Sequence, residues 1–293
     1  MSPSENKKAV QKMTVPLIQK MKRGGEKIVM VTCYDYSFAR LIDEAGVDIV
    51  LVGDSLGMVI QGQKSTLPVT LEEMIYHSRC VARGLTRPLL VTDMPFMSYQ
   101  SSQGEAIKNA GRLLKEGKAE SIKLEGGVEV ADLIHRMNRI GIPVMGHIGL
   151  QPQSFHKYGG YKIQGKTPQE ERHLLEDALA VQEAGCWSVV LEGVPVDVAQ
   201  KITGRLKIPT VGIGCGPSCD GQVLVLYDLL GMNPDFNPRF LKRYANLAEV
   251  VTESVSLFRQ EVKDQRFPTE EHGVRRNVID ATLKIRQRNA SGT

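Results

Sequence analysis

Short apolar segments recur along the chain at intervals that suit strands separated by helices. Most of them are rich in Val, Ile and Leu and are almost continuously apolar, which is typical of parallel strands covered on both faces. Eight candidate strands follow from this pattern, at residues 28–33, 48–52, 88–92, 120–124, 143–146, 187–191, 208–213 and 223–227.

The segments between these candidate strands carry the signals of amphipathic helices. The pairs Thr70–Glu73 and Ser102–Glu105 have the spacing of a capping box, and Pro168 stands where a helix would begin. Glycines follow several expected helix ends, at positions 46, 117, 141 and 185. Strands that alternate with helices in this way predict an α/β fold, a single-domain (β/α)8 TIM barrel, with an open doubly wound sheet as the alternative.

The same pattern predicts how the chain is divided. We expect residues 1–25 to form an N-terminal extension and first helix, residues 26–262 the catalytic barrel, and residues 263–293 a basic, mobile tail. The eighth unit is the least regular, because residues 231–240 are rich in proline and loop-like. Helical spacing of apolar residues resumes at 246–262.

The composition of the 293 residues narrows the class of protein. A net charge of +4 and an aromatic content of 5% do not favour binding of nucleic acid. The five cysteines are irregularly spaced, which indicates reduced thiols and no zinc site. No apolar run is long enough to span a membrane and no secretory signal is visible, so we expect a cytoplasmic protein. The basic N-terminus leaves a mitochondrial address as an alternative.

Ionisable residues stand directly after five consecutive candidate strands. In a (β/α)8 barrel the active site lies at the ends of the strands, so these side chains are expected to meet there. A single carboxylate after a strand is better explained as a cap on the next helix, but ionisable residues after five strands in succession are harder to explain in this way. The residues are Asp54, Asp93, Lys123 with Glu125, His147 and Glu192.

Three of these residues, Asp54, Asp93 and Glu125, offer only oxygen atoms as ligands. Hard oxygen ligands suit Mg²⁺ or Mn²⁺ better than Zn²⁺, and Mg²⁺ typically keeps water or substrate oxygens in its shell. A 2-oxo acid would bind such an ion through its oxo and carboxylate oxygens, and the ion would stabilise an enolate. We therefore predict one Mg²⁺ site per subunit at these three carboxylates.

The remaining candidates would bind the substrate or move protons. Lys123 lies two residues from Glu125 and so points to the same face of the strand. We assign it to the substrate carboxylate, although it would also neutralise the acidic residues around it. Ser55 is a second candidate for that carboxylate. Glu192 is the candidate general base or acid, with helix capping as the alternative, and His147 either assists proton transfer or is structural.

Eight stretches that surround these residues are similar to a known family and occur in order within residues 12–247. They are TCYDYSFARL (32–41), LVGDSLGMVIQGQKSTLPVTLEEM (51–74), TDMPFMSY (92–99), IKLEGG (122–127), GHIGLQPQS (146–154), GGYKIQGK (159–166), VLEGVP (190–195) and GIGCGPSCDGQVLVLYDLLG (212–231). Each alone is weakly specific, but together they are highly specific. The chain thus resembles the ketopantoate hydroxymethyltransferase family.

This resemblance implies a (β/α)8 barrel that binds Mg²⁺ and assembles as a homo-oligomer, often a decamer. It implies transfer of a hydroxymethyl group from 5,10-methylenetetrahydrofolate to 3-methyl-2-oxobutanoate, which yields 2-dehydropantoate and tetrahydrofolate in the first committed step of pantothenate synthesis. By motif, the metal ligands would be Asp54, Asp93 and Glu125, the substrate contacts Asp54, Ser55, Asp93 and Lys123, and the proton acceptor Glu192.

Two positions depart from the family pattern, although neither is a proposed reacting group. Cys215 stands where Ala is more frequent, and Gly193 stands where Cys or Thr is frequent. The alternative function is a Mg²⁺-dependent C–C lyase or mutase of the isocitrate lyase and phosphoenolpyruvate mutase type. Those enzymes also use Mg²⁺, carboxylates at strand ends and enolate-like chemistry. They carry a catalytic cysteine in a KKCGH-like loop, which this sequence lacks. A catalytically silent binding protein is a further alternative, which would predict replaced site residues.

Overall fold

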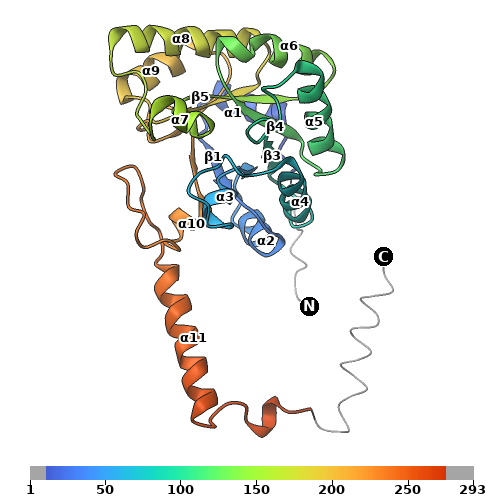
Figure 1. Cartoon of the computed structure of the whole chain (residues 1–293), viewed down its shortest axis with the longest axis vertical. Helices are drawn as coiled ribbons and strands as arrows, with labels where there is room; N and C mark the ends of the chain where they lie inside the picture. Colours follow the sequence, from blue (N-terminus) through green and yellow to red (C-terminus); the bar gives the residue numbers. More distant parts are fainter. Residues whose placement is uncertain (1–10, 275–293) are drawn as a thin grey trace, which may run out of the picture.

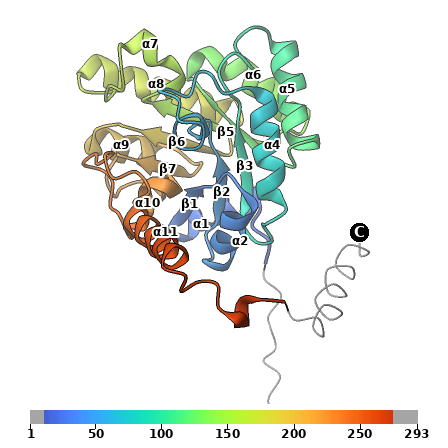
Figure 2. The same cartoon turned by 60° about the horizontal axis from the view of Figure 1, so that its bottom comes forward.

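The computed structural model describes residues 11–274, which form a closed barrel of eight parallel strands and confirm the predicted (β/α)8 TIM barrel. Each strand pairs with the next along the chain, and β1 pairs with β8 to close the sheet. Helices surround the strands in Figures 1 and 2. The strands are β1 (Ile28–Thr32), β2 (Ile49–Val52), β3 (Leu89–Asp93), β4 (Ser121–Glu125), β5 (Val144–Gly149), β6 (Ser188–Glu192), β7 (Thr210–Ile213) and β8 (Gly221–Leu224).

The helices of the wall bury one apolar face against the strands. In α5 (Gln103–Lys115), for example, Ala106, Ala110 and Leu113 recur at helical spacing and are buried. The other described helices are α1 (Val15–Gly24), α2 (Tyr36–Glu44), α3 (Leu56–Val59), α4 (Leu71–Ala82), α6 (Ala131–Arg139), α7 (Phe155–Tyr158), α8 (Pro168–Glu183), α9 (Val196–Arg205), α10 (Leu226–Leu229) and α11 (Leu247–Lys263). Within residues 11–274, no helix is long and apolar enough to cross a membrane.

Helix α1 closes the end of the barrel at which the strands begin. Its residues Ile18 and Met21 are buried and join an apolar cluster with Ile28 and Ile49, which lie near the starts of β1 and β2. The helix is fastened at this end by hydrogen bonds such as that from Gln19 Nε2 to the carbonyl oxygen of residue 187 at 3.4 Å. The interior is therefore filled at one end with apolar side chains, and polar groups are left to the other end.

The predicted boundary of the eighth strand is wrong. The strand covers Gly221–Leu224 rather than residues 223–227, and the apolar run continues into α10. A continuously apolar run has no period that separates a buried strand from a buried helix, so the sequence pattern could not mark this boundary. Glycine is required at 221, because a Cβ there would lie 2.5 Å from the carbonyl oxygen of Ile28.

The helix caps largely follow the prediction. Thr70 and Glu73 form the capping box of α4 in both directions. Ser102 accepts a hydrogen bond from the backbone N–H of Glu105, but the Glu105 carboxylate accepts from Ser101 instead of the Ser102 backbone. The Ser102 side chain therefore caps α5 as predicted, but the predicted return bond from the Glu105 side chain is wrong.

The predicted eighth helix is present as α11, which ends at Lys263, one residue beyond the expected range. The domain boundaries stay predictions. The predicted mobility of the tail falls partly on residues 275–293, which lie outside the described residues.

The wall of the barrel is incomplete on one side. The crossover from β7 to β8, residues 214–220, contains no helix. On the outer face of β1 the side chain of Val29 is 48% exposed, and Gln222 of β8 is exposed as well. Helix α11 follows β8 in the chain but has no buried residue, and Figure 1 shows it extending away from the barrel. Within residues 11–274, strands β8 and β1 thus have no covering helix from their own chain.

The Thr70 cap provides a test of the local energetics. Thr70→Ala should lower the free energy of unfolding by about 1 kcal/mol, because a backbone N–H at the start of α4 loses its partner. The melting temperature should then fall by roughly 2–4 °C in differential scanning calorimetry. Thr70→Ser, which keeps the hydroxyl, is the control, and an equal loss in both variants would contradict the capping explanation.

Candidate active site

The residues predicted from the strand ends meet at the C-terminal end of the barrel. Asp54 follows β2, Asp93 ends β3, and Lys123 and Glu125 lie on β4. The side chains of all four are at most 6% exposed relative to an open chain, so they form a buried polar cluster. The neighbouring strands hold them in register, with Asp93 opposite Lys123 and Glu125 opposite His147.

Asp93 contacts both Lys123 and the backbone of Asp54. Its Oδ1 lies 2.9 Å from Lys123 Nζ, and its Oδ2 accepts a hydrogen bond of 3.1 Å from the backbone N–H of Asp54. The ion pair brings Lys123 into the middle of the cluster, where it is also close to the other carboxylates. Lys123 therefore neutralises part of the negative charge, as the alternative interpretation of this residue expected.

His147 connects Lys123 with Glu192. Lys123 Nζ lies 3.2 Å from His147 Nδ1, so Nδ1 accepts and the ring proton belongs on Nε2. His147 Nε2 lies 3.3 Å from Glu192 Oε2, although without the alignment of a good hydrogen bond. Burial, and then the Lys123 charge, lower the pKa of His147, which keeps the ring neutral near pH 7. The side chain of Glu192 is 26% exposed and is the group of this set that reaches solvent.

Ser55 is held by a residue that the sequence analysis did not select. Its Oγ lies 2.8 Å from the hydroxyl oxygen of Tyr34, which is buried after β1. Tyr34 stands in the TCYDYS stretch, but nothing in its local pattern distinguishes it from a core tyrosine. A hydroxyl pair of this kind fixes the side chain of Ser55 at the edge of the cluster.

Gln153 and Tyr99 were also not selected, although both are buried within the cluster. Gln153 Nε2 donates to Asp54 Oδ2 at 2.8 Å, and its backbone N–H donates to Glu125 Oε2 at 3.1 Å. The Tyr99 hydroxyl accepts from the backbone N–H of Glu125 at 3.2 Å. A search restricted to ionisable groups at strand ends misses neutral side chains on loops, and only their place within family-like stretches could have drawn attention to them.

The charges of the cluster do not balance. Four carboxylates, Asp54, Asp93, Glu125 and Glu192, surround the one ammonium group of Lys123. Burial, followed by repulsion from Asp93, raises the pKa of Asp54 to about 7. Burial, followed by repulsion from Asp54, also raises the pKa of Glu125 well above its usual range. In both residues burial and repulsion disfavour the ionised carboxylate, and a bound divalent cation would favour it again.

The donor set fits a hard cation. The ligand atoms are carboxylate oxygens, and Asp93 Oδ1 is buried without a well-aligned hydrogen bond. Among residues 11–274, no three His, Cys, Asp or Glu side chains converge as a ready-made metal shell. That arrangement suits Mg²⁺, which is held by one or two carboxylates and keeps water or substrate oxygens, better than Zn²⁺, which takes three or four protein ligands. Direct ligation by all three predicted residues stays a prediction.

Comparison with known proteins assigns the chain to a family. The family model for ketopantoate hydroxymethyltransferase matches residues 12–270. The chain belongs to this family. A 3-methyl-2-oxobutanoate hydroxymethyltransferase of Pelobacter propionicus is 56% identical over 262 residues, which is 89% of this chain and 97% of the relative. The enzyme of the same name from Geobacter sulfurreducens is 54% identical over 88% of this chain and 97% of its own.

Solved structures outside the family share the barrel. A phosphonopyruvate hydrolase in complex with oxalate and Mg²⁺ has a TM-score of 0.60 at 12% identity, covering 94% of this chain and 97% of its own. A 2,3-dimethylmalate lyase of the phosphoenolpyruvate mutase and isocitrate lyase superfamily has a TM-score of 0.58 at 14% identity, covering 94% and 98%. At this level of identity the likeness concerns the fold alone, so it does not favour the lyase or mutase alternative.

Removal of the single ammonium group tests the charge balance. Lys123→Met should lower the free energy of unfolding by about 3 kcal/mol, because it leaves Asp93 buried without its partner. The control is Lys12→Met, which removes an exposed ion pair with Glu120 and should cost less than about 1 kcal/mol. Denaturant unfolding without metal measures both, and a Lys123→Met variant as stable as the control would contradict the assigned role.

Proposed function

We propose that the protein is a Mg²⁺-dependent 3-methyl-2-oxobutanoate hydroxymethyltransferase that uses 5,10-methylenetetrahydrofolate as cosubstrate. The observation that carries the proposal is the joint position of Asp54, Asp93, Lys123, Glu125 and Glu192 at one end of the barrel of a chain that belongs to this family. The reaction would join the C3 carbon of the 2-oxo acid to the one-carbon unit. With one water, it yields 2-dehydropantoate and tetrahydrofolate, the first committed step of pantothenate synthesis.

The metal site is proposed at Asp54, Asp93 and Glu125. Bound there, Mg²⁺ would polarise the 2-oxo group and stabilise negative charge on its oxygen. Lys123 and Ser55 face the same space, so we assign them, together with Asp54 and Asp93, to contacts with the substrate. The Lys123 ammonium would pair with the substrate carboxylate, and the hydroxyl of Ser55, already oriented by Tyr34, would donate to it.

Glu192 is the proposed proton acceptor. It is the carboxylate of the cluster that is partly exposed, and it lies on β6, across the barrel mouth from β2 and β3. The C3 proton of the substrate would pass to a Glu192 oxygen, and the electron pair of the C–H bond would form the enolate. His147 Nε2 lies 3.3 Å from Glu192 Oε2, and after a small rotation its N–H would donate to the carboxylate and hold it in place for this transfer.

Proton exchange tests this role directly. In D₂O with Mg²⁺ and no folate, 3-methyl-2-oxobutanoate should lose its C3 proton signal in NMR spectra at a rate that depends on enzyme and metal. Glu192→Gln should slow the exchange by about 100-fold or more, because the amide does not accept the proton.

The control for this experiment is Glu26→Gln, an exposed carboxylate just before β1, at the end of the barrel where the strands begin. Unchanged exchange in Glu192→Gln would show that another group is the base. If the wild-type protein showed no exchange without folate but did so with tetrahydrofolate, folate would have to bind before the proton is removed.

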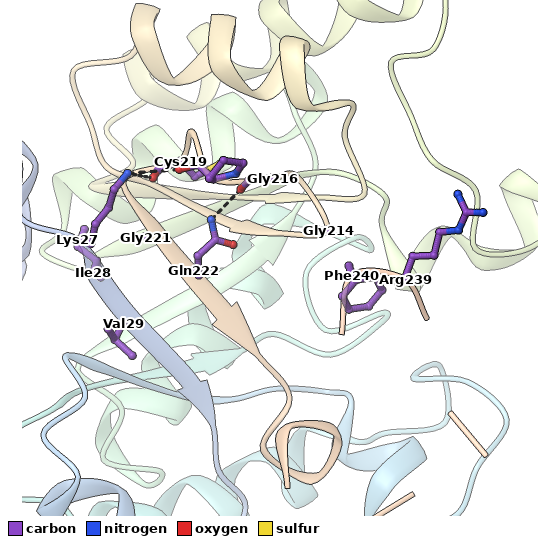
Figure 3. A pocket seen from close by; sticks show the side chains of 11 residues that line it. Lys27, Ile28, Val29, Gly214, Gly216, Cys219, Gly221, Gln222, Arg239 and Phe240 are labelled. Carbon is purple, nitrogen blue, oxygen red and sulfur yellow. Dashed lines mark hydrogen bonds between the residues drawn. The ribbon is translucent and has the colours of Figure 1, made fainter. Parts of the chain in front are cut away.

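We also propose a cytoplasmic location and assembly as a homo-oligomer. The five cysteines are unpaired, which supports a reducing compartment. Support for assembly comes from the open side of the wall. A cleft of about 680 Å³ lies there, with Val29 of β1 and Gln222 of β8 on its floor and Phe240 at its edge (Figure 3).

The occupant of this cleft is proposed to be α11 of a second copy. The apolar residues Val251, Val255, Phe258 and Val262 recur at helical spacing on α11 and are all exposed. The cleft carries Lys27 and Arg239, whereas α11 carries three glutamates against Arg259 and Lys263, so the net charge of the helix is weakly complementary to the cleft. The described part of the chain thus provides both a helix with an uncovered apolar face and a strand face that no helix covers, and a reciprocal exchange between two copies would satisfy both.

Substitution on α11 tests the assembly. Phe258→Glu should lower the molar mass in sedimentation velocity by at least a factor of two, because a carboxylate would be buried in the cleft. The control is Gln260→Glu, on the opposite face of the helix.

A cross-linking experiment identifies the partner of α11. Oxidation of a Val29→Cys, Phe258→Cys double variant should give a cross-linked dimer. A cross-link within one chain would show that α11 folds back on its own barrel, and a single-chain mass for the wild type would contradict the oligomer.

A further inference from the structure

Gln153 lies in a 3₁₀ turn, Pro152–Ser154, that follows β5 and reaches over the end of the barrel. The residue is 7% exposed, whereas the residues on either side of it are more exposed. A long polar side chain is buried at a loop position only when its hydrogen bonds are satisfied. We therefore expect hydrogen bonds within the cluster, and not the course of the backbone alone, to hold the Gln153 side chain in its buried position.

The side-chain amide of Gln153 uses all four of its hydrogen-bonding positions. Its Nε2 donates to Asp54 Oδ2 at 2.8 Å and to the carbonyl oxygen of Met94 at 2.9 Å. Its Oε1 accepts from the Tyr99 hydroxyl at 3.0 Å and from Gln100 Nε2 at 3.1 Å. Rotation of the amide by half a turn would set Oε1 against two acceptor oxygens, so the contacts allow one orientation only.

The backbone of the same residue binds a second carboxylate. The N–H of Gln153 donates to Glu125 Oε2 at 3.1 Å, while its side chain holds Asp54. Asp54 follows β2 and Glu125 ends β4, so one loop residue connects carboxylates from two strands that are not neighbours. Tyr99 strengthens the connection, because its hydroxyl contacts both Gln153 Oε1 and the backbone of Glu125.

We propose that Gln153 is a positioning residue that sets the orientation of Asp54 and Glu125 for the divalent cation. The inference rests on the proposed function and extends it to a residue that touches the ligands of the cation rather than the reacting atoms. A neutral amide suits this task because it donates to a carboxylate without neutralising it. Glutamate of the same shape would repel Asp54, and asparagine, shorter by one methylene, would not span the distance.

Binding of Mn²⁺ alone, without 2-oxo acid or folate, separates positioning from catalysis. Gln153→Ala should weaken Mn²⁺ binding by about tenfold, as is typical when a hydrogen-bond partner of a metal ligand is removed. Electron paramagnetic resonance of free Mn²⁺ measures the affinity. The matched control is Gln100→Ala, which removes one hydrogen bond to Gln153 but none to a carboxylate, and its affinity should stay within about twofold of the wild-type value.

A second variant covers the case in which Gln153→Ala does not fold. Tyr99→Phe keeps the buried ring but removes a hydroxyl that, unlike the Gln100 amide, contacts both Gln153 Oε1 and the backbone N–H of Glu125. It should therefore weaken Mn²⁺ binding in the same direction by a smaller factor. The melting temperature without metal is recorded for every variant. Wild-type affinity in folded Gln153→Ala, or in Tyr99→Phe if the first variant does not fold, would overturn this inference and leave the proposed function intact. A wild-type protein that binds no Mn²⁺ would refute the metal-dependent function, and the role of Gln153 with it.

Discussion

The burial of three carboxylates around one lysine, with the partly exposed Glu192 beside them, is the constraint on which the functional end of the barrel depends. Removing ionised carboxylates from water is costly, and repulsion between them adds to the cost. The fold offsets part of it with the Lys123 ammonium, the backbone N–H groups of Asp54 and Gln153, and the Gln153 amide. The remaining negative charge is what makes this end suited to a cation, so the site is electrostatically prepared rather than merely polar.

The two ends of the barrel have different roles, because one stabilises the fold and the other carries the polar site. Apolar side chains of α1 and of the strand starts fill one end, where they stabilise the closed sheet. The other end carries residues that cost stability and support chemistry. A phosphonopyruvate hydrolase and a 2,3-dimethylmalate lyase share the barrel at 12–14% identity, so the same fold is formed by very different sequences.

Much of this architecture could be predicted from the sequence, because each of its signals is local. Continuous apolar runs located the strands, and ionisable residues directly after them located Asp54, Asp93, Lys123, Glu125 and Glu192. The end of β8 could not be located, since the apolar run passes from strand into helix without a change of period. The roles of Gln153 and Tyr34 depend on contacts with residues distant in the chain, and no local pattern encodes such contacts. The exposed state of α11 is equally non-local, because its amphipathic sequence is the same whether or not a partner covers it.

The position of α1 has a practical consequence. Because this helix enters the barrel at the end where the strands begin, the N-terminal part of the described chain lies on the face opposite to the acidic cluster. A surface linker or a fused protein attached ahead of α1 would therefore leave the mouth of the barrel open to small molecules.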